Sequence, residues 1–283
     1  MCCFSGEVAE VTSTRIFARA IPDGSQVLAY DMMLDARQDV AMVLPLPTPA
    51  GAADDAVGFI DLSGYGDLFD DLDRAFPTAH LPRGGSAMLS PRGQLVVHDV
   101  GDFEASFVPA RADFSRLDPR FRLSDAALDA LPVGADWGFA VFKLKHTEPV
   151  TGPAPTPPPA PGFFARLLHR PSEPAPPPPS HPRRFHPMAF RFPRRDPSRL
   201  FLPTVHVHDG AVHEVATFDH ELYVQQSPPP ASVEAPTWLA QEKTVSEVID
   251  VPRTAGLLVA DEAVWKATLR GRLPNRDTWL SPT

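Results

Sequence analysis

Histidines recur in the stretch "HVHDGAVHEVATFDH", which begins at His206. Within it, Asp209-Gly210 is a strong signal for a two-residue hairpin turn. That turn places His206 opposite His213, and His208 shares the same strand face as His206. Three neutral imidazoles on one face are ligands that Zn²⁺ or another first-row divalent metal selects. The spacing therefore predicts a metal site at His206, His208 and His213.

The register of this hairpin decides which ligands meet. If the turn takes three residues, Glu214 replaces His213 opposite His206, and the site becomes two histidines with a carboxylate. Asp219 or His220 would complete either set or orient one of its ligands. The competing interpretation is that these histidines are solvated or pair with carboxylates of an acidic protein.

The chain holds two cysteines, Cys2 and Cys3, and a disulfide between adjacent residues would be strained. If Met1 is removed, Cys2 becomes an N-terminal nucleophile with its own amine as base, as in a hydrolase. If the N-terminus folds over the histidine hairpin, both thiolates join a mixed Cys/His metal site. The third alternative is a small apolar pair that caps the first strand.

Other catalytic signatures are absent from the sequence. It contains no G-x-S-x-G elbow, no H-E-x-x-H helix and no C-x-x-C pair. His80, His98 and His146 are isolated and are interpreted as structural. No nucleophile, base and oxyanion donor can be assembled, so the leading hypothesis is a non-enzymatic protein. A metal-dependent or N-terminal-cysteine hydrolase is the alternative.

The elements that must position these residues are mostly strands. "TRIFARAI" and "SQVLAYDMML" flank the turn signal Pro22-Asp23-Gly24, and "DVAMVLPLPTP" and "WGFAVFKLKH" are further apolar strands. Two helices are predicted. One is "GDLFDDLDRAF", with an apolar stripe and solvent-facing aspartates, and the other is "SDAALDALP" with Ser124 as N-cap. The fold class is mainly β (α+β), an antiparallel β-sandwich or curved sheet with two or three short helices.

A proline-rich segment interrupts the strands at residues 149–186. Prolines at that density preclude helix and sheet, which predicts a disordered insertion. The strands on either side favour an elaborated hairpin loop, so residues 1–283 are predicted to form a single β-rich domain; a hinge between two domains is the alternative. A PxxP-type match within residues 153–184 makes this segment a candidate for binding a protein partner.

Charge and hydropathy bear on the partners and the cellular location of the protein. A formal charge of −9 argues against nucleic-acid binding, which needs a basic surface. The apolar runs fall short of the ~20 residues that span a bilayer, so no transmembrane segment is predicted. No signal peptide is visible at the N-terminus. These features together predict a cytoplasmic protein.

The early cysteine, "TRIFAR", "QVLAYDMML", and the element "MVLPLP" at Met42 to Pro47 are similar to a bacterial domain-of-unknown-function family, number 2330 in its series. "VHDVGDFEASF" and "WGFAVFKLK" match its later strands loosely, so the resemblance covers Cys2 to Tyr223. Members are often exported and richer in cysteine, which this chain is not, and the histidine hairpin is not part of the pattern. The resemblance implies a mainly β, single-domain fold and no assigned activity.

Overall fold

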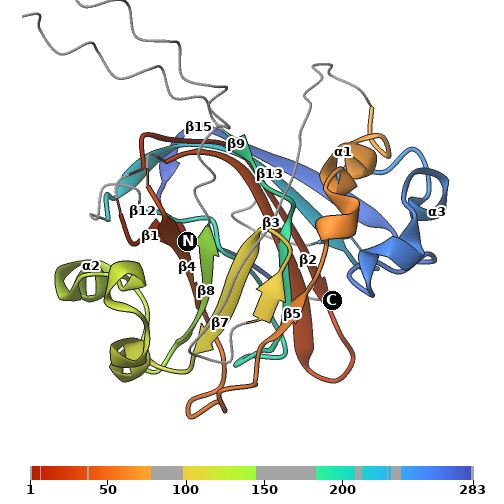
Figure 1. The fold of residues 1–283 in the computed structure, drawn as a ribbon. Coiled ribbons are helices and arrows are strands. Elements are labelled where there is room, and N and C mark those ends of the chain that lie inside the picture. Colours follow the sequence, from red (N-terminus) through yellow and green to blue (C-terminus); the bar gives the residue numbers. More distant parts are fainter. Residues whose placement is uncertain are drawn as a thin grey trace, which may run out of the picture.

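The computed structural model describes residues 2–6, 8–36, 38–77, 98–144, 183–207, 212–227, 229–230 and 237–281. Within these residues the protein is mainly β, with three sheets and a few short helices, which confirms the predicted fold class. The two larger sheets pack face to face, and the helices lie on their outer faces (Figure 1).

The smaller of the two main sheets has six strands. Their order is β12 (His206–Val207), β1 (Cys2–Phe4), β4 (Val40–Leu46), β8 (Gly138–Leu144), β7 (Phe103–Val108) and β6 (His98–Val100). β4 is buried along its whole length, because Met42 and Leu44 face the other sheet while Ala41 and Val43 face the outer cluster. A strand buried on both faces explains the continuous apolar run in its sequence.

The larger sheet has eight strands. Their order is β14 (Leu239–Ala240), β15 (Val264–Pro274), β13 (Val215–Gln225), β2 (Glu10–Ala20), β3 (Ser25–Asp35), β10 (Met188–Pro193) and β5 (Gly58–Ile60), with β9 (Arg183–Arg184) beside β3. A two-stranded sheet joins β11 (Leu200–Leu202) to β16 (Thr278–Leu280). The pairing is antiparallel throughout except for β1 with β12 and β2 with β13, which are parallel.

The central core lies between the two main sheets. Phe142 of β8 packs edge-on against Phe59 and Phe103, with ring centroids 5.4 and 5.9 Å apart, and also contacts Phe190 of β10. All four rings belong to this core, and Phe142 is completely buried. Aromatic packing of this kind contributes more than the buried area alone, so this cluster is a principal contact between the sheets.

Helices cover the outer faces, as Figure 1 shows. On the larger sheet lie α1 (Leu68–Asp73), α3 (Val245–Val248), and the 3₁₀ helices η1 (Ser63–Tyr65) and η5 (Val251–Thr254). On the smaller sheet lie α2 (Asp125–Ala130), η2 (Arg111–Arg116) and η3 (Pro119–Phe121). None of the helices in the described residues is long and apolar enough to cross a membrane.

Several local predictions are confirmed. The Pro22-Asp23-Gly24 turn joins β2 to β3, with Gly24 in the left-handed region at φ +87°. The apolar stripe of the first helix is buried against the larger sheet. At α2, the Ser124 hydroxyl accepts a hydrogen bond from the backbone of Ala127 at 3.1 Å, as an N-cap does.

Two predictions about the chain around the proline-rich segment need correction. β8 and β10 do not form a hairpin, because β8 pairs with β4 and β7 whereas β10 pairs with β3 and β5. The segment therefore connects one main sheet to the other. Its predicted C-terminal limit at residue 186 is also too late, because Arg183 and Arg184 already pair with β3. Residues 145–182, including most of the predicted partner-binding stretch, lie outside the described residues.

Candidate functional site

The histidine-rich stretch contributes to both main sheets. β12, with His206, pairs with β1, whereas β13, with His220, pairs with β2 and β15. In the described part of the chain β12 and β13 do not pair with each other, so the predicted register of His206 opposite His213 is wrong. The physical reason is that each strand completes a different sheet rather than a local hairpin. His208 and the turn residues 209–211 lie outside the described residues.

His206 and His220 nevertheless meet across the gap between the sheets. Their Nε2 atoms lie 2.7 Å apart, and their rings stack with centroids 4.6 Å apart at an interplanar angle of 27°. His220 is buried at 2% exposure, and His206 is half-buried. A distance of 2.7 Å means that one imidazole donates its N–H to the other nitrogen, so at least one ring carries a proton on Nε2.

An aromatic ring flanks this histidine pair. Phe218, two residues before His220 on β13, lies 4.7 Å from the His206 ring and 5.2 Å from the His220 ring, measured between centroids. Phe218 is buried at 2% exposure. The ring limits the rotation of both imidazoles and shields them from water on that side.

The backbone of His206 is held by an asparagine, Asn275, that belongs to no recognisable sequence motif. Asn275 Oδ1 accepts from the His206 N–H at 2.8 Å, and Asn275 Nδ2 donates to the His206 carbonyl at 2.9 Å. The next backbone N–H upstream, that of Val205, donates to Asp277 at 3.0 Å. Asn275 is the one asparagine in the chain, and that rarity was the available signal.

The N-terminal strand lies beside the histidine pair. Cys2 is the register partner of His206, and Cys3 is the register partner of Val207. Cys3 is buried at 2% exposure in the cluster that also holds Val207 and faces α2. Because neighbouring residues of a strand face opposite sides, His206 projects to the other side of the sheet from Cys3. The Cys3 thiol is therefore not brought to the histidines.

His213 and Asp219, two further predicted ligands, do not join the pair. His213 is exposed, ahead of β13. Asp219 is exposed on the opposite face of β13 from His220, and its carboxylate accepts from Arg270 at 3.1 Å. Among the described residues, no set of three or more histidine, cysteine or acidic side chains is arranged to hold a metal ion. The structure thus joins two of the predicted ligands, His206 and His220, and places the backbone of Cys2 next to them.

A second cluster of ionisable groups lies between the larger sheet and α1, and no motif in the sequence predicts it. Arg15 of β2 donates to Asp31 of β3 at 2.8 Å and to Asp70 of α1 at 2.6 Å, and Arg184 of β9 donates to Asp70 at 2.6 Å. Lys266 continues the cluster and donates to Asp73 at 2.5 Å. Asp70 and Asp73 of the first helix were predicted to face solvent, and that prediction is wrong because both carboxylates pair with cations of the larger sheet.

The charged side chains of this cluster form ion pairs with one another. Burial raises the pKa of Asp31 to about 6, against the opposing effect of Arg15. Burial and the neighbouring carboxylates of Asp73 and Glu221 raise the pKa of Tyr223 well above its ordinary value. The Tyr223 hydroxyl donates to both of those carboxylates. Because the charged groups neutralise one another, the cluster fixes α1 on the sheet rather than presenting a reactive group.

Comparison with known proteins gives distant likenesses. No family model matches the chain, and no match was found among curated proteins. The crystal structure of baculovirus P35 is 12% identical, with a TM-score of 0.43 over 98% of this chain and 97% of that chain. The caspase-8/P35 complex is 11% identical, with a TM-score of 0.42 over 96% of each chain. With TM-scores below 0.5, these likenesses establish neither the fold family nor the function of this chain.

Proposed function

We propose that this chain is a non-enzymatic, β-rich protein that binds one first-row divalent metal, Zn²⁺ above all, between His206 and His220. The observation that carries the proposal is the convergence of two imidazole Nε2 atoms from two different sheets at 2.7 Å. Neutral imidazole is a preferred ligand of zinc, and a metal would replace the proton that the two nitrogens share.

Binding of zinc between the two imidazoles requires a small movement of one ring. Two nitrogens bound to one tetrahedral zinc ion lie about 3.3 Å apart, given Zn–N distances of about 2.0–2.1 Å. The pair must therefore open by roughly 0.6 Å. His206 is half-buried at the edge of its sheet whereas His220 is buried, so the movement is assigned to the His206 side chain.

Two residues supply candidates for further ligands. Cys2 pairs through its backbone with His206, and His208 follows His206 by two residues. A thiolate is a strong zinc ligand, and a reducing compartment keeps it available. We therefore propose a mixed site of His206, His220 and Cys2 in a cytoplasmic, bacterial protein, with His208 as a fourth ligand.

Metal analysis of the purified protein tests this proposal. We expect about one equivalent of zinc in the unchanged protein, and a loss of at least roughly tenfold in His206→Ala and in His220→Asn. His213→Ala is the matched control, because His213 is exposed and was the ligand predicted by the hairpin register. Unchanged zinc content in both His206→Ala and His220→Asn would contradict the proposal, and loss in His213→Ala would restore the hairpin site.

The alternative is a hydrolase, either metal-dependent with an open coordination position or dependent on Cys2 as nucleophile. The observation that favours it is the position of β1 next to β12, which brings the N-terminal strand to the histidines. Mass spectrometry of the N-terminus discriminates between the two roles of Cys2. A retained Met1 excludes an N-terminal nucleophile but leaves the Cys2 thiolate able to bind zinc. Comparing Cys2→Ser with the unchanged protein, both loaded with Co²⁺, would then show whether the thiolate is a ligand.

The proposed partners follow from charge and composition. We propose no nucleic-acid binding, given the formal charge of −9. A protein partner that binds polyproline segments would dock on residues 153–184.

A further inference from the structure

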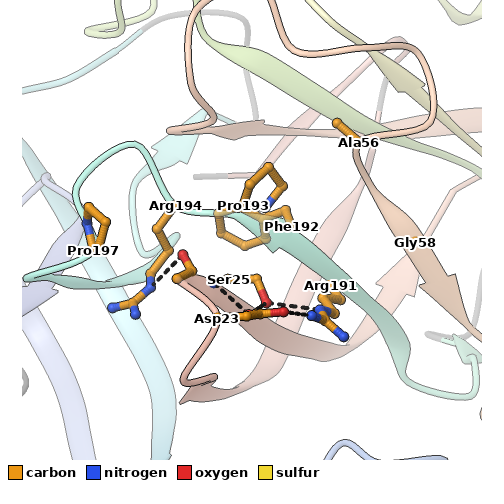
Figure 2. Close-up of a pocket in the computed structure, with 10 residues that line it drawn as sticks. Asp23, Ser25, Ala56, Gly58, Arg191, Phe192, Pro193, Arg194 and Pro197 are labelled. Atoms are coloured by element: carbon orange, nitrogen blue, oxygen red, sulfur yellow. Dashed lines mark hydrogen bonds and ion pairs between the residues drawn. The ribbon is translucent and has the colours of Figure 1, made fainter.

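A pocket of about 510 Å³ lies at the turn of the β2–β3 hairpin. Residues that follow β10, Arg194 and Pro197, form its other side. Figure 2 shows its lining, which includes Asp23 from the turn, Ser25 at the start of β3, Arg191 and Arg194 from β10 and just beyond, and Gly58 at the start of β5. The volume is within the range of sites for small organic ligands. The pocket shares no residue with the histidine pair or the ion-pair cluster.

One of the two arginines is already neutralised within the pocket. Arg191 Nη2 forms an ion pair with Asp23, and its Nε donates to the Ser25 hydroxyl at 2.8 Å. The other carboxylate oxygen of Asp23 accepts from the backbone and the hydroxyl of Ser25, at 3.0 and 2.6 Å. Asp23 is thus saturated, and Arg191 has its counter-charge.

The other arginine has no such counter-charge. Arg194 is buried at 9% exposure, and its Nε and Nη1 donate to the carbonyl oxygens of Gly24 and Arg199 at 3.3 and 3.1 Å. Among the described residues no carboxylate lies within ion-pair distance of its guanidinium. Burial lowers the pKa of Arg194, and only the more distant Asp196 opposes that effect. A buried cation without an anion is costly, so an anion in the pocket would be stabilised there.

The charged and apolar residues that line the pocket indicate which class of ligand it would bind. The lining carries one negative and two positive side chains, so a single negative charge neutralises it. The remaining walls include Ala56, Pro193 and Pro197, which are apolar. We propose that this pocket binds a monoanionic carboxylate with an apolar tail, whose carboxylate pairs with the guanidinium of Arg194.

Isothermal titration with benzoate tests this, with benzamide as the neutral analogue and inorganic phosphate as the competing anion. At about pH 8, where phosphate is mainly a dianion, we expect saturable binding of benzoate, none of benzamide, and weaker binding of phosphate, whose second charge the lining does not neutralise. Arg194→Gln should weaken benzoate binding at least about tenfold, because a charge-assisted hydrogen bond is lost. The matched control is Arg195→Gln, because Arg195 donates instead to Thr48 and Asp136, outside the lining.

A second variant keeps Arg194 and fills the pocket. A Cβ built at Gly58 meets nothing within 4 Å, so a side chain has space to begin there, and Gly58→Phe adds a ring beside the pocket. It should abolish benzoate binding and leave the melting temperature unchanged. The proposal is overturned if the unchanged protein does not bind benzoate, if Gly58→Phe binds it fully, or if phosphate binds more tightly than benzoate.

Discussion

Asp31 shows how a single buried carboxyl connects three sheet strands and, through two arginines, a helix. It lies in β3 at 2% exposure and accepts from Arg15 of the neighbouring strand. Arg184 of β9 donates to the same carboxylate at 3.3 Å, and both arginines also reach Asp70 of α1. Four side chains from distant parts of the sequence therefore share their charges. Replacing any one of them changes the electrostatics of the other three.

The pKa of Asp31 predicts the direction of a pH effect on stability. Because burial raises this pKa from about 4 to about 6, the folded protein holds a proton between those values that the unfolded chain has released. The contribution of Asp31 to the free energy of unfolding is therefore full below pH 4 and decreases as the pH rises to about 6. We expect the stability of the unchanged protein, relative to Asp31→Asn, to fall by up to about 3 kcal/mol between pH 4 and pH 7.

Urea unfolding of both proteins at intervals of pH measures this difference. Asp35→Asn provides the control, because it is another buried aspartate at the end of the same strand. A relative stability that instead increases with pH would show that the two arginines outweigh burial and that the pKa of Asp31 lies below its ordinary value.

At the scale of elements, close approach between strands restricts side-chain size. Gly138 begins β8 and lies beside Phe107 of β7 and Thr48 after β4. Its backbone N–H donates to the Thr48 hydroxyl at 3.2 Å. A Cβ at this position would lie 2.6 Å from Phe107 Cζ and 2.8 Å from Thr48 Oγ1. The glycine is therefore required for strand packing.

Gly138→Ala should accordingly destabilise the protein by about 1–3 kcal/mol, because the added methyl group forces Phe107 or the strand to shift. Chemical denaturation measures the change. Gly58→Ala is the matched control, a glycine at the start of another strand with open space at its Cβ, and should change stability by less than about 0.5 kcal/mol. Equal effects of the two substitutions would show that strand propensity, rather than the contact with Phe107, determines the cost.

At the scale of the whole molecule, strand β16 contributes side chains to the core between the two main sheets. β16 pairs with β11, and Leu280 is completely buried in the core between the sheets. Trp279 packs on Phe201, with ring centroids 4.8 Å apart, and on Trp137 at 6.3 Å. Residues on both sides of the proline-rich segment, Phe142 and Phe190, enter the same core. The two flanking segments therefore share one hydrophobic core, and one domain with an insertion stays a prediction.

Deleting Gly152–Ser180 tests the insertion directly. The remaining residues 145–151 and 181–182 can span up to about 30 Å between β8 and β9. Since loop length has a small effect on folding free energy, we expect the melting temperature to change by less than about 2 °C. Deleting Thr278–Thr283 is the control that removes buried side chains and should lower it by much more. Failure of the shortened chain to fold would favour two domains that pack through the segment.

The amino-acid sequence by itself determined the local features of this protein. Alternating and continuous apolar runs specified strands, Pro22-Asp23-Gly24 specified a turn, and Ser124 specified a helix start, because each depends on residues that are neighbours along the chain. Only the tertiary structure decided which distant segments meet. It separated the histidine strands into two sheets, brought His220 to His206 and β1 to β12, and turned Asp70 of α1 toward two arginines of the larger sheet. Strand partners are chosen by burial over the whole core, which no single window of sequence contains.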